Sequence, residues 1–180
     1  FRSIWSVFDP LYPSDGLEST LKKVFGDSMF SDMDTACLIT SFDLEKNVAC
    51  SFLHDVGPNA KAYTVRSAVR ESPREDISDG AAGNGAKADL PGRKSLRSDL
   101  EIKEGANYYV RDIAHASSAA PYYFRPARIS EPGGNGEELV LVDGGMVANN
   151  PTLQALTYAP TFLPGSINDI AVFSVGCGTT

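Results

Sequence analysis

The sequence has few of the residues that build metal centres or disulfide frameworks. It contains three cysteines and two histidines among 180 residues, and none of them lies at metal-ligand spacing. An odd number of cysteines leaves at least one thiol unpaired, which favours a reducing compartment. We therefore expect no metal, no cofactor and three buried free thiols.

Basic charge and long apolar runs are also scarce. Lysine and arginine number 16 against 23 acidic residues, a formal net charge of −7, so no basic excess exists to neutralise nucleic-acid phosphates. No apolar run approaches membrane-spanning length, and no signal segment opens the chain. We expect no nucleic-acid partner and a cytoplasmic or peripheral-membrane location. An acidic chain is poorly captured by anionic lipid, so any membrane contact would come from apolar loops; the oligomeric state is unknown from these patterns.

A long internal stretch lacks aromatic residues. None occurs from 71 to 107, where charges of both signs mix with glycine and proline. Such a composition buries too little apolar surface to offset the entropy of ordering. The sequence therefore predicts a mobile insertion at about 71–107, and a solvated loop is favoured over a partner-binding segment.

The clearest local pattern lies around Asp143. Leu139 to Val142 is a continuous apolar run bounded by turn-forming residues, which predicts a strand buried on both faces. Asp143 then falls at the carboxyl end of the strand, followed by Gly144 and Gly145. Active sites of open α/β sheets lie beyond such strand ends, which makes Asp143 a candidate catalytic carboxylate. The alternative is a turn residue that accepts main-chain N–H groups.

A helix and a further strand are predicted after this motif. Asn150 suits the helix N-cap and Pro151 the first helical position, so a helix is expected over 152–158. Ile170 to Val175 is typical of a strand. It begins about 30 residues after Leu139, the spacing of a strand–helix–strand unit with a right-handed crossover.

Other elements follow from periodicity. Apolar residues at helical spacing predict helices over 17–25, ending at Gly26, and over 108–118. Two strand-like runs, 36–43 and 47–53, predict a hairpin. Its register would pair Cys37 with His54 and Cys50 with Ser41, which keeps the two thiols too far apart for a disulfide.

Three segments resemble the patatin-like phospholipase family. The stretch 142–151, Val-Asp-Gly-Gly-Met-Val-Ala-Asn-Asn-Pro, resembles the family's second signature, in which an Asp-Gly-Gly or Asp-Gly-Ala motif carries the Asp of a Ser-Asp dyad. Ile113 to Phe124 looks like the family's helix ending in a Ser-Ala-Ala-Pro turn, and Phe173 to Thr180 like its strand after the Asp motif. The resemblance is clear from about Tyr108 to Thr180 and looser over the first 56 residues.

The resemblance implies a fold and an activity. The fold would be α/β, with a central, mostly parallel sheet flanked by helices. The activity would be that of a lipid acyl hydrolase of the phospholipase A type, acting on phospholipid or acylglycerol in lipid degradation, with transient contact with a membrane surface. Asp143 would be the proton acceptor, within the motif Asp143, Gly144 and Gly145.

The nucleophile of such a dyad is missing from the sequence. No Gly-x-Ser-x-Gly elbow occurs in the 180 residues, and in the family it precedes the segments matched here. We therefore interpret 1–180 as the C-terminal part of one patatin-like domain, inactive alone. Asp143 would need a dry site to act as a base, and Val142, Met146 and Val147 are the apolar neighbours expected to provide it. A catalytically inactive lipid- or protein-binding module is the alternative.

A different serine esterase pattern is the lesser alternative. Gly26-Asp27-Ser28 is similar to the opening of Gly-Asp-Ser esterases, and Asp112-x-x-His115 to their Asp-x-x-His motif. Ser28, Asp112 and His115 would then be the catalytic residues. Matches this short arise often by chance.

Overall fold

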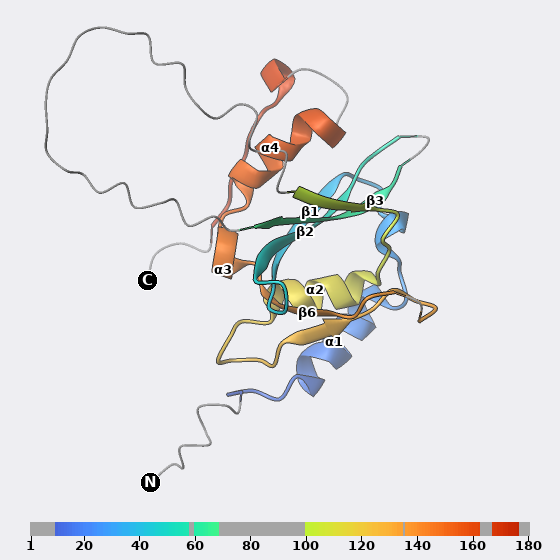
Figure 1. Ribbon diagram of the computed structural model, residues 1–180, viewed down its shortest axis with the longest axis vertical. Helices are drawn as coiled ribbons and strands as arrows, with labels where there is room; N and C mark the ends of the chain where they lie inside the picture. The colour runs from blue at the N-terminus through green and yellow to red at the C-terminus, as the bar shows by residue number, and fades with distance from the viewer. Residues whose placement is uncertain (1–9, 58–59, 69–99, 135, 163–166, 177–180) are drawn as a thin grey trace, which may run out of the picture.

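The computed structural model describes residues 10–57, 60–68, 100–134, 136–162 and 167–176. The helices are α1 (Asp15–Phe25), α2 (Val110–Ser118), α3 (Gly145–Ala148) and α4 (Thr152–Phe162), with 3₁₀ turns η2 (Phe30–Asp32) and η3 (Ile167–Asp169). The strands are β1 (Cys37–Asp43), β2 (Val48–His54), β3 (Ala62–Ala68), β4 (Leu100–Glu104), β5 (Ala127–Ile129) and β6 (Leu139–Asp143) (Figure 1). None of the described helices has the length and apolar character needed to cross a bilayer.

All six strands form one sheet, in the order β4-β3-β2-β1-β6-β5. Every pairing between them is antiparallel, so the expectation of a mostly parallel sheet is wrong for the described part of the chain. Short connections explain part of the difference, because a tight turn such as that between β1 and β2 joins only antiparallel neighbours.

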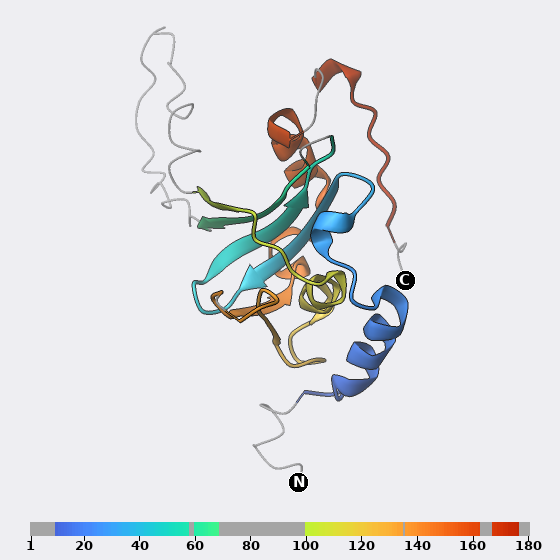
Figure 2. The same ribbon diagram turned by 90° about the vertical axis from the view of Figure 1, so that its right-hand side faces the viewer.

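The predicted strand at Ile170 to Val175 is also absent. These residues have no regular secondary structure, and Phe173 is 92% exposed. Figure 2 shows the segment as an extended trace outside the sheet. An apolar run of strand length does not by itself reveal whether a partner strand is available, and this one pairs with none of the described strands.

The helix predictions are confirmed. α1 ends at Phe25, and its C-cap is Gly26, whose φ of 56° is a positive value that favours glycine. α2 ends at Ser118, just before Pro121. At α4, Oδ1 of Asn150 accepts the main-chain N–H of Thr152 at 3.1 Å, as an N-cap does.

The β1–β2 hairpin has the predicted register. Cys37 pairs with His54, and Ser41 with Cys50, so the two thiols are four residues apart along the ladder and both are free. Burial raises the pKa of Cys50 to about 12. Cys37 is only half-buried, which corrects the expectation for that thiol, and Cys177 lies outside the described residues.

The predicted insertion is shorter than expected at its C-terminal end. Residues 100–104 form β4, which pairs with β3, and Ala106 is only 3% exposed. An edge strand needs little apolar surface, since one of its sides faces solvent and carries charged residues. The remainder of the predicted insertion, 71–99, lies outside the described residues.

The core lies between α2 and the sheet. α2 lies against the sheet (Figure 1) and contacts β1, β5 and β6. Its residues Ile113 and Ala116 are fully buried. Phe52 of β2 meets the Tyr108 ring edge to face, with centroids 5.6 Å apart. Leu141 of β6 completes the same cluster, so the strand that ends at Asp143 is anchored by the core.

Candidate functional site

Asp143 occupies the predicted place at the carboxyl end of β6. The four preceding residues of the strand are all buried. The apolar run therefore fixes the strand in the core, and the carboxylate lies at its end, where burial is only partial. The main-chain N–H of Asp143 donates to the carbonyl of Ala119, just after α2, at 3.0 Å. Its side-chain Oδ1 accepts the N–H of Gly145 at 2.7 Å. One carboxylate oxygen is thus fixed by the motif itself.

Gly144 packs against the main chain of β1. A Cβ atom at this position would lie 2.3 Å from Oγ1 of Thr40 and 2.4 Å from its carbonyl oxygen. The backbone angles of Gly144 are ordinary helical values, φ −62° and ψ −19°, so space and not conformation requires glycine. A Cβ on Gly145 would meet Oδ1 of Asp143 at 3.1 Å, a contact that a small shift relieves. The loop expected after Asp143 instead contains the short helix α3, beginning at Gly145.

Ser41 supports the strand end from β1. It is the direct cross-strand neighbour of Asp143 and only 1% exposed. Its Oγ donates to the carbonyl of Val142 at 2.7 Å, with the carbonyl of Ala116 in α2 at 3.4 Å. The hydroxyl is therefore engaged with main chain and is shielded from solvent. Sequence reasoning missed Ser41, because its proximity depends on the β1–β6 pairing, for which the sequence carries no local signal.

The surroundings of Asp143 are less apolar than expected. Val142 is 2% exposed, as predicted, but Met146 is 60% and Val147 37% exposed. α3 turns these two side chains away from the described core, which corrects the prediction that they dry the site. Neither of the two described cavities has Asp143 among its lining residues.

The residues of the Gly-Asp-Ser alternative are brought together only in part. Asp112 and His115 line one cavity of about 740 Å³, but Ser28 is not among its lining residues. Ser28 instead ties the start of α2 to the preceding loop, because its carbonyl accepts the N–H of Val110 at 2.9 Å. Burial raises the pKa of Asp112, and the nearby Arg111 and His115 oppose this.

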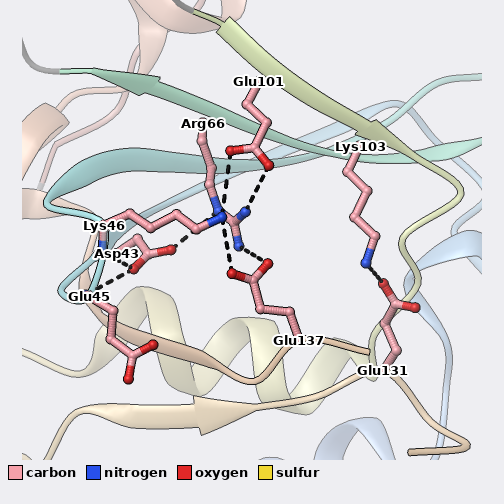
Figure 3. A network of polar contacts seen from close by, with 8 residues as sticks. All are labelled: Asp43, Glu45, Lys46, Arg66, Glu101, Lys103, Glu131 and Glu137. Carbon is pink, nitrogen blue, oxygen red and sulfur yellow. Dashed lines mark hydrogen bonds and ion pairs between the residues drawn. The ribbon is translucent and has the colours of Figure 1, made fainter. Parts of the chain in front are cut away.

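A second polar cluster surrounds Arg66 of β3, whose side chain is 5% exposed. Its Nε lies 3.2 Å from Oδ2 of Asp43, and its two terminal nitrogens lie 3.3 Å from Glu101 and 3.1 Å from Glu137 (Figure 3). Lys46 adds a contact of 3.0 Å to Glu137. The other oxygen of Asp43 accepts two main-chain N–H groups of the β1–β2 turn, each at 3.0 Å. Each of these charged groups has an ion-pair partner within the cluster, although Nε of Arg66 is buried and makes no hydrogen bond among the described residues. The Arg66 cluster therefore joins strands.

Within the described ranges, no group of three or more histidine, cysteine or acidic side chains is arranged to hold a metal ion. His54, one of the two histidines, is buried. Its ring nitrogens lie 3.3 Å and 3.1 Å from the carbonyl oxygens of Thr35 and Ser31. His54 thus secures the loop before β1, a structural role.

Comparison with known proteins shows which family the sequence matches. The family model described as patatin-like phospholipase matches residues 2–156. Patatin-like protein 2 of Oryza sativa subsp. indica is 32% identical over 97 residues, which cover 45% of this chain and 24% of that protein. Patatin-like protein 1 of Arabidopsis thaliana is 37% identical over 94 residues, covering 45% and 23%. The cUMP-AMP-activated phospholipase of Escherichia coli is 37% identical over 75 residues, covering 41% and 22%. The chain spans about a quarter of the length of these curated relatives.

Proposed function

The chain belongs to the patatin-like phospholipase family, and from this premise we propose that Asp143 is the proton acceptor of a Ser-Asp dyad in a lipid acyl hydrolase. The substrate would be the carboxylic ester of a phospholipid or acylglycerol, reached by transient contact with a membrane surface from a cytoplasmic or peripheral location. No cofactor takes part in the proposed chemistry.

The observation that carries the proposal is the way the strand end presents Asp143. The bond from Gly145 fixes Oδ1, while Oδ2 accepts no hydrogen bond within the described part of the chain. A carboxylate with one oxygen held and the other available is suited to accept a proton from a positioned hydroxyl. The close packing of Gly144 against Thr40 holds the carboxylate at the strand end.

The reaction would proceed by acyl transfer. As the serine oxygen attacks the ester carbonyl, Asp143 takes the hydroxyl proton and returns it to the alcohol oxygen of the lipid as that C–O bond breaks. A serine ester forms. Asp143 then takes a proton from the attacking water and returns it to the serine oxygen as the fatty acid is released.

We further propose that residues 1–180 are the C-terminal part of one patatin-like domain. The 180 residues contain no Gly-x-Ser-x-Gly sequence, so the serine and the oxyanion donors would come from outside them. The 180-residue chain alone should therefore have no esterase activity, and its turnover of a p-nitrophenyl acyl ester should equal that of buffer.

The dyad is tested by Asp143→Asn in the proposed longer protein. A general base contributes about 10²- to 10⁴-fold to rate, so hydrolysis of a p-nitrophenyl acyl ester should fall by at least ~100-fold. The thermal melt should change little, because Asn keeps the oxygen that accepts the Gly145 N–H. Retained turnover would refute the dyad, and a large loss of stability would assign Asp143 to the turn.

The second candidate is a catalytically inactive module that binds lipid or protein. The exposure of Met146 and Val147 favours it, since these apolar side chains do not enclose Asp143 in the dry site that a catalytic carboxylate needs. If this sequence is part of the longer protein proposed above, the segment that precedes it there discriminates the two. A Gly-x-Ser-x-Gly turn there supports the hydrolase, and its loss with retained binding to vesicles supports the module.

A further inference from the structure

Four large side chains are exposed together at the loop that joins α2 to β5. Tyr122 and Tyr123 of this loop are 67% and 46% exposed. Leu11 and Tyr12, from the segment before α1, are 43% and 50% exposed. We call these four residues the tyrosine cluster. Large apolar side chains that are exposed as a group, and not singly, mark interaction surfaces.

Ring contacts and main-chain hydrogen bonds hold the tyrosine cluster in one arrangement. Tyr12 stacks on Tyr123, with ring centroids 6.1 Å apart and planes 13° from parallel. Tyr122 meets Tyr123 edge to face, with centroids 5.5 Å apart. The main-chain N–H of Leu11 donates to the carbonyl of Tyr122 at 3.0 Å, and a matching bond at 2.9 Å joins Tyr12 to Tyr123. Two segments that are distant in the sequence therefore present one preformed surface.

Tyr122 has a backbone conformation that tyrosine rarely adopts. Its φ is 74°, in the left-handed region where a residue other than glycine is strained. Strained residues persist where the surrounding structure fixes them, and they are concentrated at functional sites. The strain does not serve the core, because most of the Tyr122 side chain is exposed. It therefore indicates a role at the surface.

The loop that carries the tyrosine cluster is tied to the end of β6. The main-chain N–H of Asp143 donates to the carbonyl of Ala119 at 3.0 Å, and Ala119 lies three residues before Tyr122. Figure 1 shows this loop and α3, which follows Asp143, on the same side of the molecule, the left in this view. A partner that contacts the cluster would therefore lie near the proposed dyad.

The tyrosine cluster is electrically neutral. Residues 10–14 and 116–124 contain no charged side chain, although the chain carries a formal net charge of −7. A neutral surface on an acidic chain does not attract anionic lipid, but it is compatible with a zwitterionic lipid surface. Tyrosine is enriched where membrane meets water, because its ring is apolar and its hydroxyl is polar.

The size of the tyrosine cluster favours a lipid surface over a protein partner. At roughly 200 Å² for a tyrosine side chain, the exposed fractions of the cluster amount to about 400 Å². A stable protein interface buries about 800 Å² on each partner, twice what the cluster offers. Reversible membrane binding has no such threshold, since its strength scales with the apolar area that is buried.

We propose that the tyrosine cluster is the surface by which this protein contacts a zwitterionic phospholipid membrane. The rings and the Leu11 side chain would lie at the level of the lipid headgroups, with the tyrosine hydroxyls towards water. The choice of lipid as the partner rests on the proposed hydrolase function, but the contact itself does not use the carboxylate of Asp143.

Membrane binding is tested by sedimentation of the 180-residue chain with vesicles of phosphatidylcholine. The vesicles should capture the chain, and replacing part of the lipid with phosphatidylglycerol should not strengthen capture. Monomeric dihexanoylphosphatidylcholine, the soluble short-chain form, should not compete, because the cluster contacts a surface and not one headgroup. Absence of capture, competition by the monomer, or stronger capture by the anionic vesicles would overturn the proposal.

Variants locate the contact. Removing about 60 Å² of apolar contact corresponds to about 10-fold in affinity, so Tyr122→Gly and Leu11→Ser should each weaken capture by about that factor. Tyr122→Gly should melt at the wild-type temperature or above, because glycine relieves the strained φ. Val24→Ala on α1 and Phe173→Ser change side chains that are 68% and 92% exposed outside the cluster, and both should bind as the wild type does. Wild-type capture of both cluster variants, or an equal loss in either control, would refute the assignment.

Two further measurements separate the alternatives. Asp143→Asn should bind vesicles as the wild type does, so loss of vesicle binding refutes the tyrosine cluster alone, and retained turnover of a soluble ester by Asp143→Asn refutes the dyad alone. Analytical ultracentrifugation should show no self-association that depends on the cluster. A dimer at micromolar concentration that Tyr122→Gly abolishes would assign the surface to a second copy of the chain and overturn the proposal.

Discussion

Gly144 lies so close to Thr40 that any side chain on it would overlap the neighbouring strand. A Cβ atom there would be 2.3 Å from Oγ1 and 2.4 Å from the carbonyl oxygen of Thr40. The next residue, Gly145, has only the carboxylates and amides of its own loop nearby, at 3.1 Å and beyond. The two glycines therefore differ in function: the first permits the strand end to pack on β1, and the second leaves room beside the carboxylate.

Alanine at the two glycines should have unequal effects. Gly144→Ala forces a Cβ into the main chain of Thr40, and overpacking of this kind costs about 1–3 kcal/mol or more of unfolding free energy. Gly145→Ala, the matched control, should cost less than ~1 kcal/mol, because Asp143 can move by a few tenths of an ångström. Urea unfolding followed by circular dichroism measures both. Equal losses would show that β6 does not approach β1 as described.

Ser41→Ala tests the support of the strand end. The variant removes the hydroxyl that donates to the carbonyl of Val142 at 2.7 Å, and leaving a buried carbonyl short of a donor costs roughly 1–3 kcal/mol. Ser118→Ala is the control, because its hydroxyl also donates to a main-chain carbonyl, that of Ala114 at 2.7 Å, but is exposed. The free energy of unfolding of Ser118→Ala should fall by no more than about 0.5 kcal/mol in the same urea assay. If the two variants unfold alike, burial of the Ser41 hydroxyl is not stabilising.

The features that were predicted correctly depend on residues close together in the sequence. The end of β6 at Asp143, the cap of α4 at Asn150 and the end of α1 at Gly26 each depend on neighbouring residues. The β1–β2 register was also predictable, because a short turn fixes which residues face each other. The position of the candidate carboxylate was therefore readable from the sequence.

The predictions that failed concern contacts between residues that are far apart in the sequence. The sheet direction and the absence of a strand at Ile170 to Val175 depend on which strands meet, and an apolar run does not encode its partner. The roles of Ser41 and Arg66 depend on residues that are distant in sequence. The outward direction of Met146 follows from α3, which the glycine-rich sequence did not suggest.

Arg66→Met tests whether the Arg66 cluster stabilises the sheet. The variant leaves Asp43, with 3% of its side chain exposed, as a buried carboxylate without its cation, and breaking such a pair costs about 3–5 kcal/mol. Arg128→Met, which breaks the exposed pair with Glu138, should cost at most ~1 kcal/mol. The double variant Asp43→Asn with Arg66→Met should recover part of the loss, because no buried charge remains. A double variant as unstable as the sum of both single variants would contradict an electrostatic origin.

Glu137 should make the stability of the protein depend on pH in the acid range. The hydrogen bond from Lys46 lowers the pKa of this carboxyl below its ordinary 4.5, Arg66 adds to the effect, and partial burial opposes it. The folded state thus binds fewer protons than the unfolded chain near this pH, so the stabilisation is complete above about pH 4.5 and is lost as pH falls through the lowered pKa.

Urea unfolding from pH 6 to pH 3 should show a shallower decline in the free energy of unfolding for Glu137→Gln than for the wild type. Lys46→Met should also reduce this decline, because it removes the main cause of the lowered pKa. Added salt should weaken the effect, since 45% of the Glu137 side chain is exposed. An unchanged decline in both variants would show that these ion pairs do not persist in solution.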